Sequence, residues 1–169
     1  TQFAAGARDN RLTIGRLDDP ESVRVIDTDF GPLLDVEFWE SKNALVTSSL
    51  YSRLVVWQLP DLKIGNSHRY FAGSGHFAID RASDRLLIGG GDGVVVSLDD
   101  VQASPDVIRT DHGGVQDLLI HGSTLVVCHE SGPASVVACE TGRVIRTIPD
   151  QTFQEEHSQL TPATMTCVA

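Results

Sequence analysis

The residues of this chain whose types most often do chemistry are its six histidines, and two of them lie near a cysteine. His121 and His129 are separated by seven residues, and Cys128 directly precedes His129. Zinc sites use histidine nitrogen and cysteine sulfur, but these ligands have to converge on one ion. Successive residues of a strand point to opposite faces, so Cys128 and His129 cannot both reach one ion from a strand. We therefore expect no metal site here.

Two glycine-rich segments are the other places where catalysis or phosphate binding has to be considered. Segment 89–93 reads Gly-Gly-Gly-Asp-Gly, but it has neither the spacing of a dinucleotide-binding loop nor a P-loop lysine, and it leads into a strand. Segment 73–76 contains Ser74 and His76, yet no nucleophile-elbow pattern surrounds the serine. We therefore expect no enzyme activity, no cofactor and no small-molecule ligand.

The elements that have to position these residues follow one repeated pattern. Segment 45–57 has the pattern of a strand, a polar turn and a second strand, and segments 3–15, 86–98 and 125–137 fit the same pattern. The last residues of the four segments lie 42, 41 and 39 residues apart along the chain. A period of roughly 40 to 45 residues with four short strands is typical of propeller blades. The sequence therefore predicts an all-β fold built from repeated four-stranded antiparallel sheets.

Alternation within the second repeat shows how its strands are expected to lie. Leu34, Val36 and Phe38 fall on one face of a strand, and the continuous apolar run 44–48 predicts a strand buried on both faces. Trp39 directly follows the first of these strands, and we expect it to be packed. Sixteen strands are predicted: 3–5, 12–17, 23–26, 34–38, 44–48, 54–59, 68–71, 77–80, 85–89, 94–98, 107–110, 115–120, 125–129, 135–139, 143–148 and 164–168.

Several of these segments resemble the WD40 family. Segment 55–59, Val-Val-Trp-Gln-Leu, is similar to the end of a WD repeat, and segment 74–76, Ser-Gly-His, is similar to the Gly-His that opens one. Segment 111–114 is a weaker match. The resemblance implies a β-propeller, usually of seven blades, that serves as a rigid platform for protein contacts. It also implies a hydrogen-bond network of His, strand Ser or Thr, turn Asp and Trp, for which the second repeat offers Trp57 with Ser48 or Ser49.

The repeats divide the chain into successive blades. They give a partial blade 1–30, blades 31–73, 74–112 and 113–149, a linker loop 150–162 and the start of a next blade at 163–169. About four blades would leave a WD40 ring open, so we expect the chain to be a segment of a larger, seven-bladed ring. Two alternatives remain open: a partner chain supplies the missing blades, or the last strand pairs into the first repeat and closes a four-bladed ring.

Binding residues are expected in the turns at the tops of the blades. Those turns carry Arg8, Asn10, Tyr51, Arg53 and Asp92. Tyrosine and arginine are the residue types most often found at interface hot spots. For Tyr51 two arrangements remain open, because its ring can be an exposed anchor or can pack locally beside Trp57.

Composition narrows the class of partner. The chain has 23 acidic and 13 basic residues, a net charge of -10 and no run of basic residues, which argues against direct nucleic-acid binding. No apolar run approaches the roughly 20 residues of a membrane span. Three cysteines without a Cys-x-x-Cys pair favour a reducing intracellular compartment, cytoplasm or nucleus. Cys128 and Cys139 fall on neighbouring predicted strands, where they could face each other, and we expect them to be free buried thiols.

These observations favour a non-catalytic scaffold or adaptor that binds other proteins within a multiprotein complex. One alternative is a ribosome-assembly or RNA-processing factor in a ribonucleoprotein. The other is an enzyme-type propeller with a site in its central channel.

Overall fold

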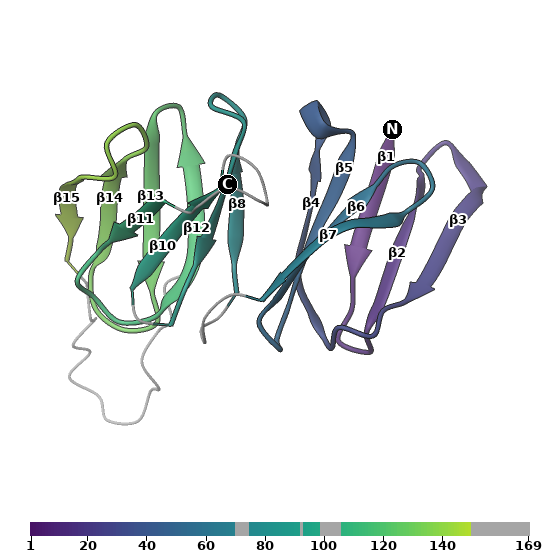
Figure 1. Cartoon of the computed structure of the whole chain (residues 1–169), viewed down its shortest axis with the longest axis horizontal. Helices are drawn as coiled ribbons and strands as arrows, with labels where there is room; N and C mark the ends of the chain where they lie inside the picture. Colours follow the sequence, from purple (N-terminus) through teal and green to yellow (C-terminus); the bar gives the residue numbers. More distant parts are fainter. Residues whose placement is uncertain (70–74, 92, 99–105, 150–169) are drawn as a thin grey trace, which may run out of the picture.

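The protein is all-β in the computed structural model, which describes residues 1–69, 75–91, 93–98 and 106–149. The described residues form fifteen strands and one short 3-10 helix. The strands make four antiparallel sheets that lie side by side (Figure 1). Each sheet is a meander in which strands consecutive in the chain pair with each other.

Three of the four sheets have four strands, and the first has three. The first sheet consists of β1 (Gln2–Gly6), β2 (Arg11–Arg16) and β3 (Asp19–Asp27). The second consists of β4 (Leu33–Trp39), β5 (Ala44–Ser49), β6 (Arg53–Gln58) and β7 (Lys63–Arg69), with the 3-10 helix η1 (Glu40–Lys42) between β4 and β5. The third consists of β8 (Phe77–Asp80), β9 (Arg85–Gly89), β10 (Val94–Leu98) and β11 (Asp106–Arg109). The fourth consists of β12 (Val115–His121), β13 (Thr124–His129), β14 (Ala134–Ala138) and β15 (Val144–Ile148).

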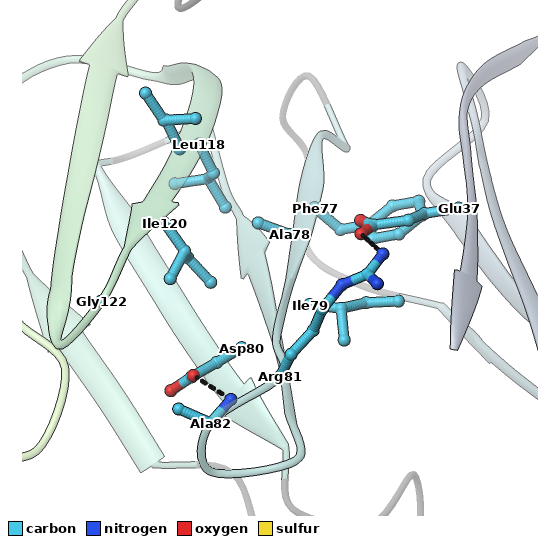
Figure 2. A pocket seen from close by; sticks show the side chains of 11 residues that line it. Glu37, Phe77, Ala78, Ile79, Asp80, Arg81, Ala82, Leu118, Ile120 and Gly122 are labelled. Atoms are coloured by element: carbon cyan, nitrogen blue, oxygen red, sulfur yellow. Dashed lines mark hydrogen bonds and ion pairs between the residues drawn. The ribbon is translucent and has the colours of Figure 1, made fainter. Parts of the chain in front are cut away.

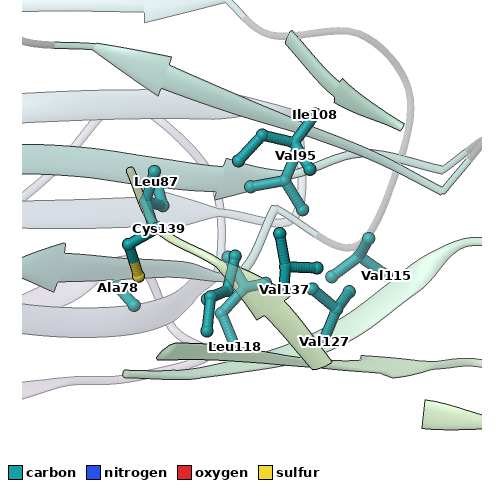
Figure 3. Close-up of a cluster of buried hydrophobic side chains, with 10 residues drawn as sticks. Ala78, Leu87, Val95, Ile108, Val115, Leu118, Val127, Val137 and Cys139 are labelled. Carbon is teal, nitrogen blue, oxygen red and sulfur yellow. The ribbon is translucent and has the colours of Figure 1, made fainter. Parts of the chain in front are cut away.

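Neighbouring sheets pack through their first strands. Strand β1 contacts β4, β4 contacts β8, and β8 contacts β12. A separate hydrophobic cluster fills each of the three junctions between sheets. Figure 3 shows the cluster between the third and fourth sheets, where Leu87, Val127 and Val137 meet.

Strand β5 shows how one strand serves two junctions. All six of its residues are buried, as expected for the run 44–48. Leu45 points into the junction with the first sheet, whereas Val46 points into the junction with the third. Alternation of side chains between the two faces of a strand therefore requires apolar residues at both positions.

The predicted strand positions are confirmed with shifts at the ends of some strands. The largest shift is in β7, which begins at Lys63 rather than at residue 68. A tight turn causes it, because the Leu62 N–H donates to Gln58 O at 2.8 Å and Leu62 has a φ of 57°. In the first sheet β3 begins at Asp19 and not at residue 23, and Leu17 lies outside β2. The predicted linker 150–162 and strand 164–168 lie outside the described residues.

The cysteines differ from the expectation of free thiols. Cys139 is a free buried thiol in the junction between the third and fourth sheets. Cys128 is disulfide-bonded, so the expectation for this residue was wrong. Cys128 follows Val127, which points into the same junction as Cys139. The side chain of Cys128 therefore points to the opposite face of the fourth sheet, and the two cysteines cannot pair with each other.

Candidate protein-interaction surface

One loop joins the two turns that carry most of the predicted binding residues. Loop 28–32 runs between the first and second sheets, at the lower edge of Figure 1. The backbone N–H and the hydroxyl of Thr28 donate to Asn10 O at 2.8 and 2.9 Å. At the other end of the loop, the Leu50 N–H donates to Pro32 O at 2.8 Å. The turn after β1 and the turn after β5 therefore lie at the same edge of the protein.

Tyr51 lies on the backbone of this loop. Gly31 has a φ of 89°, and a Cβ atom built there would lie 2.3 Å from Cδ2 of Tyr51. The tyrosine ring thus occupies the space that any side chain at position 31 would need. Tyr51 nevertheless remains 68% exposed. Its contact is with Gly31, and its outer face is open to solvent.

Arg53 completes a column of side chains that starts in the core. Its guanidinium lies 5.0 Å from the centroid of the Phe30 ring, at a distance typical of a cation–π contact. The Phe30 ring meets the buried Trp57 edge-on at 6.0 Å. The Trp57 Nε1–H donates in turn to Thr47 Oγ1 at 3.0 Å. The surface arginine is therefore positioned by a buried indole.

The hydroxyl that Trp57 contacts belongs to Thr47, not to the predicted Ser48 or Ser49. Leu45 pairs directly with Trp57 across β5 and β6, and Thr47 lies two residues further along the same face. Ser48 points to the other face of the strand. The strand register would have identified Thr47, because diagonal neighbours of a tryptophan lie within its reach.

Two of the other three predicted binding residues, Arg8 and Asn10, lie in the turn after β1. Arg8 is exposed in the turn after β1. Asn10 is exposed and has a φ of 69°, a conformation that asparagine tolerates, and its backbone carbonyl is occupied by Thr28. Asp92 lies outside the described residues. The structure therefore brings Arg8, Asn10, Tyr51 and Arg53 to one edge.

The sequence did not indicate the polar contacts between sheets. His76 Nδ1 lies 2.8 Å from Asp35 Oδ2, and the Phe77 N–H donates to the same oxygen at 3.3 Å. The hydrogen bond that His76 donates to the Asp35 carboxylate raises the pKa of His76. His76 opens a repeat in the sequence pattern, but its partner is 41 residues earlier and in another sheet.

A serine–histidine pair lies in the fourth sheet and has the geometry of a nucleophile with its base. His129 Nε2 is 3.1 Å from Ser135 Oγ, and His129 Nδ1 is 2.9 Å from Gly113 O. Because the carbonyl can only accept, Nδ1 carries the proton and Ser135 donates to Nε2. Ser135 has no exposed surface, and His129 is 4% exposed. Burial lowers the pKa of His129, and both side chains are covered by the described residues.

A cavity of about 470 Å³ lies between β8 and β12 (Figure 2). Its charged groups are engaged with one another or with the backbone. Arg81 pairs with Glu37 at 3.2 Å, and Asp80 accepts the Ala82 N–H at 3.1 Å. Ile79, Leu118 and neighbouring apolar side chains make up most of the remaining wall. The cavity therefore offers a substrate mainly hydrophobic contacts.

The chain matches no protein-family model and no curated protein. Among the described residues, no helix has the length and apolar character that crossing a membrane requires. No group of three His, Cys, Asp or Glu side chains gathers to hold a metal ion within the same part of the chain. The exposed edge around Tyr51 and Arg53 is thus the best-defined candidate site.

Proposed function

We propose that the protein is a non-catalytic platform that binds other proteins through the edge formed by the turns around Tyr51 and Arg53. The observation that carries the proposal is the support beneath these two side chains. Gly31 lies under the tyrosine ring, and Phe30 lies between the guanidinium and the core. Anchors held in one conformation lose less entropy on binding, which favours their use in recognition.

The fold of the complete protein, in this proposal, is a WD40-like β-propeller of about seven blades. Three features support it: the meander of each sheet, the contact of sheets through their first strands, and the Trp57–Thr47 hydrogen bond. The outer face of the first sheet also exposes Val23 and Val25, as expected where a further blade would pack. We place the protein in a multiprotein complex.

Two other functions have less support. A ribonucleoprotein factor that contacts RNA directly would need a basic surface, and the chain carries a net charge of -10. An enzyme would need an accessible reactive group, and the Ser135 hydroxyl is fully buried.

The proposal is tested by purifying the tagged full-length protein from native extract, as wild type and as the Tyr51→Ala, Arg53→Ala double variant. Arg146→Ala is the control, because Arg146 is also exposed and lies on β15. We expect stoichiometric partners with the wild type and the control, and their loss with the double variant. A wild-type protein recovered alone, or partners retained by all three forms, would contradict the proposal.

A further inference from the structure

Two arginines face each other at the edge of the proposed platform. Arg53 and Arg69 are direct cross-strand partners of β6 and β7. Their side chains therefore leave the same face of the second sheet, with Cβ atoms roughly 5 Å apart. Like charges in this arrangement destabilise a sheet, and an anionic partner would offset their repulsion.

No acidic side chain supplies that partner within the described residues. Six of the other eleven Lys and Arg side chains form ion pairs with Asp or Glu there: Arg11, Arg16, Lys42, Lys63, Arg81 and Arg85. Arg53 instead contacts the ring of Phe30, and Arg69 is exposed. Although acidic residues outnumber basic ones by 23 to 13 in the sequence, no carboxylate of the residues that the structure describes pairs with Arg53 or Arg69.

Two apolar side chains border the arginines. Leu50 is 57% exposed and Tyr51 is 68% exposed, and both lie in the turn that leads into Arg53. We name this surface the arginine patch; it consists of Leu50, Tyr51, Arg53 and Arg69. The patch thus combines two guanidinium groups with an exposed apolar margin.

We propose that the arginine patch binds an acidic peptide segment of a partner protein. Two carboxylates of the segment lie on the guanidinium groups, and an apolar side chain of the segment packs against Leu50 and Tyr51. Arginine suits this role because its planar fork binds carboxylates with two hydrogen bonds. The net charge of -10 repels an acidic segment from the rest of the surface and so directs it to the patch.

This inference rests on the proposed function as a protein platform, and it is tested on the full chain with a defined probe. The probe is a fluorescein-labelled twelve-residue peptide of alternating glutamate and leucine, and the matched peptide has glutamine in place of glutamate. Fluorescence anisotropy then compares the wild type with the Arg53→Gln, Arg69→Gln variant and with Arg146→Gln, an exposed arginine elsewhere.

We expect the glutamate peptide to bind the wild type and the Arg146→Gln control. We expect its affinity for the double variant to be at least about tenfold lower. Added salt should weaken the binding, and the glutamine peptide should not bind. The double variant should unfold at the same temperature as the wild type or higher, since a repulsion is removed.

Three results would overturn the inference: no binding of the glutamate peptide, equal binding of the glutamine peptide, or an equal loss in the Arg146→Gln control. Binding of a phosphoserine peptide without binding of the glutamate peptide would also overturn it, in favour of a phosphoryl ligand. If partners co-purify through Tyr51 while the glutamate peptide fails to bind, only the acidic-peptide inference fails. If no partner co-purifies with the wild type, the proposed function and the acidic-peptide inference both fail.

Discussion

The indole nitrogen of Trp39 donates a hydrogen bond of 2.6 Å to the carboxylate of Asp84, although the two residues belong to different sheets. The same carboxylate accepts a hydrogen bond from Ser41 and pairs with Lys42 Nζ at 2.8 Å. The hydrogen bonds from Lys42, Ser41 and Trp39 lower the pKa of Asp84 to about 2. The Asp84 side chain thus makes three polar contacts from the third sheet to the second, at the edge opposite Tyr51.

Asp84→Asn should lower the free energy of unfolding by about 1 kcal/mol, because the ion pair and the charged acceptor are lost. Asparagine tolerates the φ of 56° at this position, so backbone strain adds little. Urea unfolding measures the change. Asp61→Asn is the control, since its pair with Lys63 is largely exposed and should contribute almost nothing. Equal effects of the two substitutions would contradict this role for Asp84.

Trp57 and Thr47 should be coupled energetically. Trp57→Phe leaves the buried Thr47 hydroxyl without its indole partner and should cost about 2 kcal/mol, and Thr47→Val should cost about 1 kcal/mol. The double variant should cost less than the sum, by about 1 kcal/mol. A double-mutant cycle from urea unfolding tests this, and strictly additive values would show that the hydrogen bond contributes nothing.

His76 should make the protein more stable as the pH falls from 8 to 6. Its pKa is raised in the folded state by the hydrogen bond that it donates to Asp35, so its contribution is complete below the ordinary pKa of 6.5 and is lost as the pH rises through the folded value. His76→Gln should remove this slope from the plot of unfolding free energy against pH. Asp35→Asn should remove it as well, and an unchanged slope in either variant would exclude the pair as its source.

His129 should act in the opposite direction. Burial lowers its pKa in the folded state, so its contribution is complete above pH 6.5 and is lost as the pH falls through the folded value. Protonation also removes the acceptor that Ser135 uses. His129→Gln should lower stability at pH 8, where a buried network is broken, and lessen the further loss toward pH 5. Urea unfolding at these two pH values provides the comparison, with the wild type showing the steeper decrease.

Gly31→Ala should cost more stability than Gly132→Ala. The two glycines have φ values of 89° and 96°, so both substitutions carry a similar backbone strain, about 1–2 kcal/mol. At Gly132 the new methyl group meets no atom within 4 Å, whereas at Gly31 it meets the Tyr51 ring. The extra cost at Gly31 should disappear in a Gly31→Ala, Tyr51→Ala double variant. If it persists, the clash is with something other than the ring.

The strands were predictable because their signals are local. The apolar run 44–48 reflects a strand buried on both faces, and Val36 and Phe38 both pack at the junction with the first sheet. Leu34 does not, because the register of β4 shifts between Leu33 and Val36 and Leu33 packs there instead. The start of strand β7 was predicted wrongly because its first residues, 63–67, carry no local strand signal: their apolar and polar residues do not alternate. Only the hydrogen-bonded turn at Leu62 shows where this strand begins.

The candidate site was predictable only in part. Tyr51 and Arg53 were identified by residue type and by their position in a turn. Their supports, Gly31 and Phe30, lie about 20 residues earlier and in another loop, so no local pattern connects them. The same separation concealed the contact between Trp39 and Asp84, which are 45 residues apart.

The separate clusters at the three junctions explain how the repeats can share a strand pattern while the side chains that fill the junctions differ. Leu45 and Val46 are adjacent in the chain, yet each belongs to a different cluster. A substitution at one junction needs compensation only among the few side chains that meet there. The sequences at each junction can therefore change independently, so the repeats keep the same arrangement of strands after their sequences have become dissimilar.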